Sequence, residues 1–192
     1  MKLHSKYSPE LVVSRDETRY SLTNPYLDAE KRMILATNGN SLVGVPVEVE
    51  DGEQVLPDGE KGRYLSTHAL QVTHKEKPLY GLLDLDLVGD RIGPLGLSLK
   101  MGVPLEGKFP DVDAALTHFT ERKMSDPIAE DGTATISFNA RYLFRIAQAL
   151  GGGDEVVLTF KVGSLEKQAI QVRSAGGDRD LREIAVLMAC RW

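Results

Sequence analysis

Apolar and polar residues alternate along short stretches of this chain, and each stretch is bounded by turn-forming residues. Successive side chains of a strand point to opposite faces, so a period of two predicts strands with one buried face. In the last third of the chain, three such stretches follow the clearest helical segment. The segments expected to be strands are 83–87, 95–99, 133–138, 155–161, 168–173 and 183–188.

A helix is predicted over residues 139–150, where apolar side chains recur at helical spacing. Asn139 is a good N-cap for its start, and Gly151 marks its end. The inward face is expected to hold Leu143, Ile146, Ala147 and Leu150. The outward face is expected to hold Arg141, Arg145 and Gln148. The helix is therefore amphipathic, with a basic outer stripe.

A second, weaker helical pattern covers residues 64–75. Its β-branched content lowers the helix propensity. The side chains expected to face inward are Leu65, Ala69 and Val72. Those expected to face outward are His68, Gln71 and Lys75.

These elements predict an α+β fold with mainly antiparallel sheets. The polar segment 120–133, which contains Pro127 and Gly132, is the expected linker. It separates a domain over residues 1–119 from a half-domain over 134–192. The order of strand and helix in the second part can also be laid over residues 54–105, so repeated strand-helix-strand units are expected.

Composition narrows the class of protein. An apolar content of 42% in 192 residues is enough for a buried core. A lone cysteine, Cys190, and the lack of a signal peptide or membrane-length apolar run favour a reducing cytoplasm. The net charge of −5 argues against coating nucleic acid through bulk positive charge. A local basic stripe would still attract phosphates, because charges act over a Debye length of about 8 Å.

The sequence offers few residues suited to catalysis or metal binding. Asp84, Asp86 and Asp90 are the only candidate metal-binding cluster, and a polar strand face explains them more simply. The four histidines show no ligand or triad spacing, and Cys190 has no base partner in the sequence. Three glycines after residue 150 follow a helix, whereas a phosphate cradle would precede one. We expect no catalytic residue, no metal and no cofactor; a small metal-dependent enzyme is the least favoured alternative.

Four short segments carry a family resemblance, and they occur in the same order along the chain. They are LATNGNSL at 35–42, GKFPD at 107–111, ISFNARYL at 136–143 and AVLMACRW at 185–192. They resemble the Ala-Thr-Asp-Gly-His-Arg-Leu turn, the Gly-Arg-Phe-Pro-Asp segment, the start of the last helix and the C-terminal tail of bacterial DNA sliding clamps. These are the beta subunits of DNA polymerase III. Family chains are nearly twice as long, and Asn40, Ser41, Ala189 and Cys190 depart from the family's residues.

The resemblance implies a homo-oligomeric ring whose helices line a hole for double-stranded DNA, contacted without sequence specificity. The residues expected to meet DNA are Arg141, Arg145, Gln148, His68 and Lys75. An alternative is that a surface helix simply carries solvated arginines.

The resemblance also implies a docking pocket for peptide motifs of polymerase or repair proteins. Mapped onto this chain, the pocket holds Thr37, Gly39, Leu42, Val186, Met188, Cys190 and Arg191. An alternative is that Val186 and Met188 are ordinary core positions of a terminal strand. The predicted function is a sliding-clamp-like processivity factor, or else a clamp-fold adaptor that no longer encircles DNA.

Overall fold

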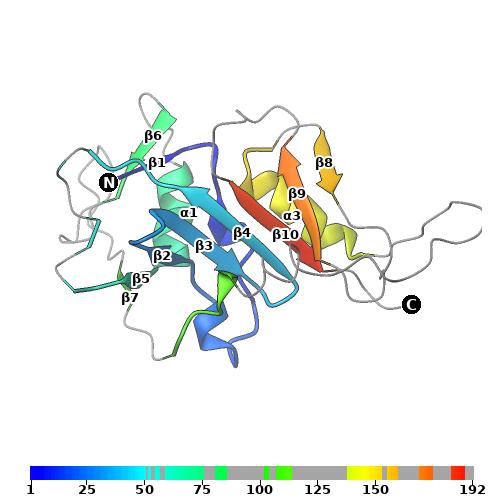
Figure 1. Cartoon of the computed structure of the whole chain (residues 1–192), viewed down its shortest axis with the longest axis horizontal. Helices are drawn as coiled ribbons and strands as arrows, with labels where there is room; N and C mark the ends of the chain where they lie inside the picture. Colours follow the sequence, from blue (N-terminus) through cyan, green and yellow to red (C-terminus); the bar gives the residue numbers. More distant parts are fainter. Residues whose placement is uncertain are drawn as a thin grey trace, which may run out of the picture.

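The computed structural model describes residues 1–50, 52, 55–56, 59–75, 81–85, 102–103, 107–113, 138–152, 155–159, 169–174 and 183–188. Its elements are β1 (Lys2–His4), η1 (Pro9–Leu11), η2 (Tyr20–Leu22), β2 (Tyr26–Asp28), β3 (Met33–Thr37), β4 (Ser41–Pro46), β5 (Gly62–Leu65), α1 (Thr67–Lys75), β6 (Leu82–Asp84), β7 (Gly102–Val103), α3 (Ala140–Ala149), β8 (Val156–Thr159), β9 (Ala169–Ser174) and β10 (Ile184–Met188). Figure 1 shows strands β3, β4, β9 and β10 in front of helices α1 and α3. The α+β class predicted from the sequence is confirmed.

One antiparallel sheet runs through most of the described chain, in the order β7-β5-β2-β3-β4-β10-β9-β8. Its first five strands come from the N-terminal part and its last three from the C-terminal part. The two parts meet where β10 pairs with β4, with Val186 opposite Leu42 (Figure 1). Strands β1 and β6 form a separate two-stranded sheet. The predicted linker at 120–133 lies outside the described residues, so the division into domains stays a prediction.

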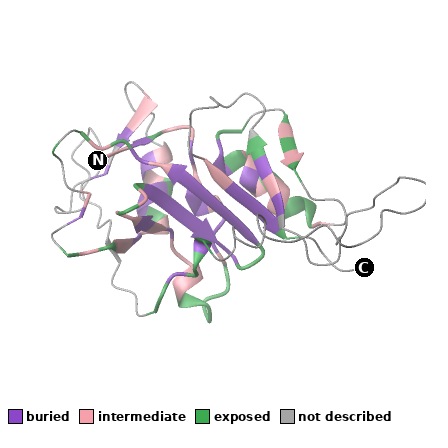
Figure 2. Cartoon of the chain, viewed as in Figure 1, coloured by how far each residue is buried: buried purple, intermediate pink, exposed green. Residues whose placement is uncertain are grey.

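The main core lies between this sheet and the helices. Ile34 of β3, Val43 of β4 and Leu187 of β10 are fully buried there. Leu70 of α1 and Ile146 of α3 pack into the same cluster. Figure 2 shows β3 and β4 as buried strands at the centre of the molecule. Each fully buried aliphatic side chain of this kind contributes roughly 1.5–3 kcal/mol to folding.

The opposite face of the sheet is covered by the segment 107–113. The Phe109 ring stacks on Tyr26, with ring centroids 5.0 Å apart and planes inclined by 12°. The Tyr64 ring meets Tyr26 edge-on at 5.3 Å. Gly62 permits this arrangement, because a Cβ at that position would overlap the Tyr26 ring. Both faces of the sheet are therefore packed.

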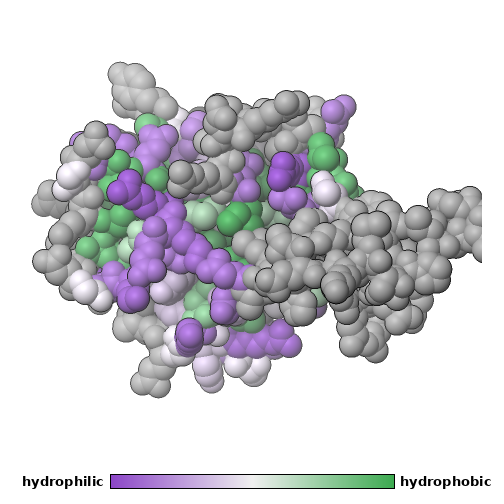
Figure 3. Space-filling view, viewed as in Figure 1, coloured by the Kyte–Doolittle hydropathy of each residue, from purple (hydrophilic) through white to green (hydrophobic). Residues whose placement is uncertain are grey.

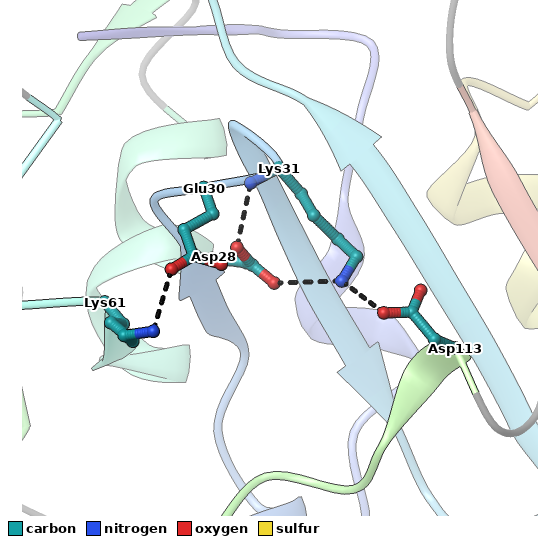
Figure 4. A network of polar contacts seen from close by, with 5 residues as sticks. All are labelled: Asp28, Glu30, Lys31, Lys61 and Asp113. Carbon is teal, nitrogen blue, oxygen red and sulfur yellow. Dashed lines mark hydrogen bonds and ion pairs between the residues drawn. The ribbon is translucent and has the colours of Figure 1, made fainter.

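Ion pairs hold the covering segment in place (Figure 4). The Nζ atom of Lys31, in the turn between β2 and β3, lies 2.8 Å from Oδ2 of Asp113 and 3.6 Å from Oδ2 of Asp28. The hydrogen bond to Asp113 raises the pKa of Lys31 against the opposing effect of burial, and the charge of Asp28 adds to it. Since these groups are partly solvated, the pairs contribute at most about 1 kcal/mol each. Their main effect is to fix where the segment crosses the sheet.

The strongest sequence predictions are confirmed in detail. The Asn139 side chain accepts a hydrogen bond from the Arg141 backbone N–H at 3.0 Å, which is the expected N-cap of α3. Gly151 has a φ of +110°, as expected for the residue after a helix end. On the inward face, however, Ala149 is fully buried, while Leu143 is only half-buried.

The predicted strand alternation is also confirmed where the structure describes it. Ile170 and Val172 of β9 are buried and Arg173 is exposed. In β6 and the residue after it, Leu83 and Leu85 are buried. The expected strand at 95–99 and most of the one at 133–138 lie outside the described residues.

The prediction that a helix begins at residue 64 was wrong. Tyr64 and Leu65 belong to β5, and Leu65 donates its N–H to the Pro25 carbonyl at 2.8 Å. Helix α1 begins at Thr67, after Ser66 accepts a hydrogen bond from the Ala69 N–H at 3.2 Å. A serine cap overrode the apolar spacing because it satisfies a backbone donor that is otherwise left free. Consequently Leu70, which the pattern did not select, faces the core.

A buried charged pair joins η1 to α1. Oε1 of Glu10 lies 3.2 Å from Nδ1 of His74, and the two side chains are 3% and 13% exposed. The same Nδ1 lies 2.9 Å from the Leu70 carbonyl oxygen. Burial of the ring lowers the pKa of His74, but the Glu10 carboxylate and nearby backbone carbonyls outweigh burial and raise it above 6.5. The protonated ring therefore fits this site better than the neutral one.

We predict that Val172→Ala in β9 lowers the free energy of unfolding by roughly 1–3 kcal/mol, because its side chain is 1% exposed. The same change at Val157 of the neighbouring strand β8, which is 49% exposed, is the matched control and is expected to cost less than about 1 kcal/mol. Urea unfolding followed by circular dichroism measures both. Equal losses would mean that the two faces of the sheet are not buried as described.

We also predict that the Glu10–His74 pair makes stability depend on pH. Because the folded pKa of His74 is raised, its contribution is complete below about pH 6.5 and is lost as the pH rises through the folded pKa. His74→Gln should therefore destabilise the protein more at about pH 6 than at about pH 8.5 in urea unfolding. His68→Gln, at an exposed position of the same helix, is the control. A constant difference across this pH range would contradict the pairing.

Candidate nucleic-acid and peptide interfaces

A groove runs between α1, α3 and the chain that follows η1, on the helical side of the sheet. Its volume is about 560 Å³. It is lined by Glu10, Leu11, Val13, Ser14, Arg15, Thr23, Thr67, Gln71, Ala140, Arg141, Phe144, Arg145 and Gln148. Residues 141, 144, 145 and 148 share one face of α3, because they follow helical spacing. The groove is thus walled by one face of α3 and by residues of the N-terminal part.

The groove is cationic despite the negative net charge of the chain. Arg15, Arg141 and Arg145 line it, and within the described part of the chain no carboxylate forms an ion pair with them. Glu10 is the acidic lining residue, and its carboxylate faces His74. The arginine side chains therefore remain available to an anionic ligand.

Three of the predicted DNA-contacting residues come together here: Arg141, Arg145 and Gln148. His68 is exposed on α1 but does not line the groove. Lys75 ends α1, and its side chain lies outside the described set. Their role in DNA contact stays a prediction.

Sequence reasoning missed Arg15, which lines the opposite wall. Arg15 lies between two short 3-10 helices, in a stretch with neither strand nor helical periodicity. The sequence pattern therefore could not predict which way its side chain points. Gln71 was expected to face outward and lines the groove as well. For Arg15, only the tertiary contact between the N-terminal part and α3 brings it to the site.

The candidate docking region is built on the tight turn between β3 and β4. The Thr37 hydroxyl donates to the Ser41 carbonyl oxygen at 2.7 Å. Oδ1 of Asn38 accepts from the backbone N–H groups of Asn40 and Ser41, each at 2.9 Å. Gly39 has a φ of +88°, a conformation that glycine adopts without strain. The turn is therefore rigidly defined by its own side chains.

Strand β10 lies beside this turn, so the two predicted halves of the docking pocket are adjacent. The Met188 N–H donates to the Asn40 carbonyl oxygen at 2.9 Å, and Val186 pairs with Leu42. Leu42 and Val186 are buried in the apolar cluster around Phe109, on the face of the sheet opposite the helices, whereas Met188 is 39% exposed. Hydrophobic surface lies over β4 and β10 on this face, next to hydrophilic side chains (Figure 3). Cys190 and Arg191 lie outside the described residues.

A further residue near this turn, Arg19, was missed from the sequence. Its Nη1 atom would lie 3.1 Å from a Cβ at Gly39, so the guanidinium rests over the turn. Arg19 also pairs with Asp16, with Nε 3.6 Å from Oδ2. A Cβ at position 39 would require this guanidinium to shift slightly, and the positive φ would strain any side chain there.

Two other expectations concern metals and membranes. Of the candidate metal cluster, Asp86 and Asp90 lie outside the described residues, as does the side chain of Asp84. The described residues hold no group of three or more histidine, cysteine or acidic side chains suited to a metal ion. Among the helices that the structure describes, none has the length and apolar character to span a membrane.

No protein-family model matches the sequence, and no curated protein sequence matches it. Solved structures do match. The DNA polymerase III beta subunit of Thermotoga maritima is 12% identical, with a TM-score of 0.57, and the match covers 100% of this chain and 65% of that one. The DNA polymerase III beta chain of Streptococcus pneumoniae is 14% identical, with a TM-score of 0.60, and the match covers 100% of this chain and 64% of that one. The sliding clamp of Bacillus subtilis is 13% identical, with a TM-score of 0.59, and the match covers 98% of this chain and 61% of that one.

This chain therefore spans less than two thirds of the length of these three clamps. At such low identity the likeness concerns the fold, and it extends over nearly the whole chain. It agrees with the antiparallel sheet and with helices α1 and α3 of the described residues. The chain thus has the fold of the bacterial DNA sliding clamps, the beta subunits of DNA polymerase III.

Proposed function

We propose that this protein is a non-enzymatic, sliding-clamp-like processivity factor that contacts double-stranded DNA without sequence specificity and docks replication or repair proteins. The observation that carries the proposal is the arginine-lined groove between the two helices, on one face of a clamp-fold sheet. Arg15, Arg141 and Arg145 can approach phosphates there, while the bulk charge of −5 disfavours binding elsewhere. Phosphate contacts of this kind carry no sequence information.

The docking part of the proposal concerns the opposite face of the sheet. One exposed apolar side chain of this face is Met188, which lies beside the turn that holds Gly39. Methionine suits a surface that accepts several peptides, because its side chain is flexible and polarizable. DNA and protein partners would then occupy opposite faces and bind at the same time. Cys190 and Arg191, which lie outside the described residues, stay predicted members of the docking pocket.

Encirclement of DNA requires more than one copy of this chain, and we propose a homo-oligomer. Among the strands that the structure describes, β8 lies at one end of the sheet order, and its Val157 side chain is 49% exposed. A strand at a sheet end offers backbone hydrogen-bonding groups to another strand. Predicted residence in the cytoplasm agrees with such a role.

The second candidate is a clamp-fold adaptor that binds proteins without encircling DNA. The shorter length relative to the matched clamps and the negative net charge favour it. The two candidates differ in how they hold DNA, because a ring is topologically linked to a closed circle and an adaptor is not.

We predict that the protein co-elutes with nicked circular DNA in gel filtration at moderate salt, once it has been loaded, and is released when the circle is linearised. Release follows because a ring slides off free ends. An adaptor would show the same weak binding to both DNA forms and would retain peptide docking. Persistent absence from the circular DNA fraction, with a loading enzyme present, would contradict encirclement.

We predict that Arg141→Ala and Arg145→Ala each weaken duplex binding roughly fivefold at low salt and reduce the slope of log K against log salt by about 1. Fluorescence anisotropy with a labelled duplex measures both quantities. Arg173→Ala removes the same charge from the opposite face of β9 and is the matched control. If all three variants lose affinity equally, the groove is not the DNA contact.

A further inference from the structure

The groove contains a feature that phosphate contact does not use. Phe144 is 62% exposed on α3, although its neighbours Ile146 and Ala149 are fully buried on the core face of the same helix. Its ring therefore contributes little to the core and is presented to the groove. Single exposed apolar side chains are common on proteins, so exposure alone decides nothing.

The residues around the Phe144 ring indicate which kind of ligand it suits. Arg141 lies one helical turn before Phe144, Arg145 directly follows it, and all three line the groove. Arg15 stands on the wall formed by the N-terminal part. An aromatic face between cations fits a ligand that has both a flat apolar ring and negative charge. Unpaired nucleotides have both, since every base has a π-face and every linkage a phosphate.

Duplex DNA fits this part of the groove less well. In duplex DNA the base faces are stacked on one another. A protein that contacts the outside of the DNA double helix therefore meets sugars, phosphates and base edges. The Phe144 ring can stack only on a base that has left the duplex. The groove volume of about 560 Å³ lies within the range of sites that hold small organic ligands.

The polar groups that line the groove suit hydrogen bonding to a nucleotide. Gln71 and Gln148 offer amides that both donate and accept hydrogen bonds. The Thr67 hydroxyl donates to the Thr23 carbonyl oxygen at 2.9 Å and can still accept a hydrogen bond. Glu10 is the lining residue that would repel a phosphate, but its carboxylate is 3% exposed and is paired with His74 at 3.2 Å. The repulsion is thereby reduced at the site itself.

We propose that the groove binds an unpaired nucleotide of single-stranded DNA, with Phe144 as the stacking platform and Arg15, Arg141 and Arg145 as phosphate contacts. The inference rests on the proposed DNA-binding function of the same groove and adds the strand state of the DNA. The protein then holds single strands, or the unpaired end of a primer–template junction, more tightly than a plain duplex.

The test is fluorescence anisotropy of the full chain with two labelled probes, a single-stranded oligo-dT and a duplex of the same length. Phe144→Leu keeps an apolar side chain of similar size and removes the π-face. We expect it to weaken oligo-dT binding about tenfold and to change duplex binding less than about twofold. Phe144→Trp keeps a stacking ring and should retain the affinity for oligo-dT. Both variants should fold, because the side chain is mostly exposed.

The outcomes separate the two proposals. If the wild-type protein binds duplex but Phe144→Leu leaves oligo-dT binding unchanged, or weakens both probes equally, the stacking site is overturned and the DNA-binding function stands. If neither probe binds the wild-type protein, both proposals are overturned. If poly(Glu,Tyr), an acidic aromatic peptide, binds the wild-type protein in a Phe144-dependent way and oligo-dT does not, the groove is a peptide site and the nucleotide proposal is overturned.

Discussion

The antiparallel pairing of β10 with β4 is the interaction on which the other features depend. It joins the three C-terminal strands to the five N-terminal strands, and so it makes one sheet from two parts of the chain. Along β10 the side chains alternate between the two faces. Leu187 enters the core beneath the helices, while Val186 and Met188 lie on the opposite face beside the turn at residue 39. A shift of the pairing by one residue would exchange these two sets and damage both faces at once.

Placement of charge explains how an acidic protein can present a cationic groove. Most of the described basic side chains outside the groove have acidic partners, as Lys31 has in Asp28 and Asp113, and Arg63 has in Glu60. Arg141 and Arg145 have none among the described carboxylates. These arginines lie in the groove itself and so act on a ligand there within a Debye length, although the chain as a whole is acidic.

Local rules predicted local structure well and tertiary placement poorly. Asn139 and Gly151 delimit α3 because capping depends on a few neighbouring backbone groups, and Val172 is buried because alternation within one strand fixes its face. The start of α1 was misplaced because apolar spacing around Leu65 fits a helix and a strand end equally. Arg15 could not be found, since its position depends on packing between distant segments. Four short segments in clamp order indicated the fold, and the likeness to solved clamps supports it.

The position of β10 within the sheet has a consequence for how the protein is made. Strand β10 lies between β4 and β9, away from the sheet ends, yet it is synthesised well after its partner β4. Until then, β4 presents an unpaired edge in the nascent chain, and such edges recruit strands of other molecules. Because the partners are separated by most of the sequence, closing the sheet is slow compared with local helix formation. Chaperone protection during synthesis would therefore matter more for this protein than its modest size implies.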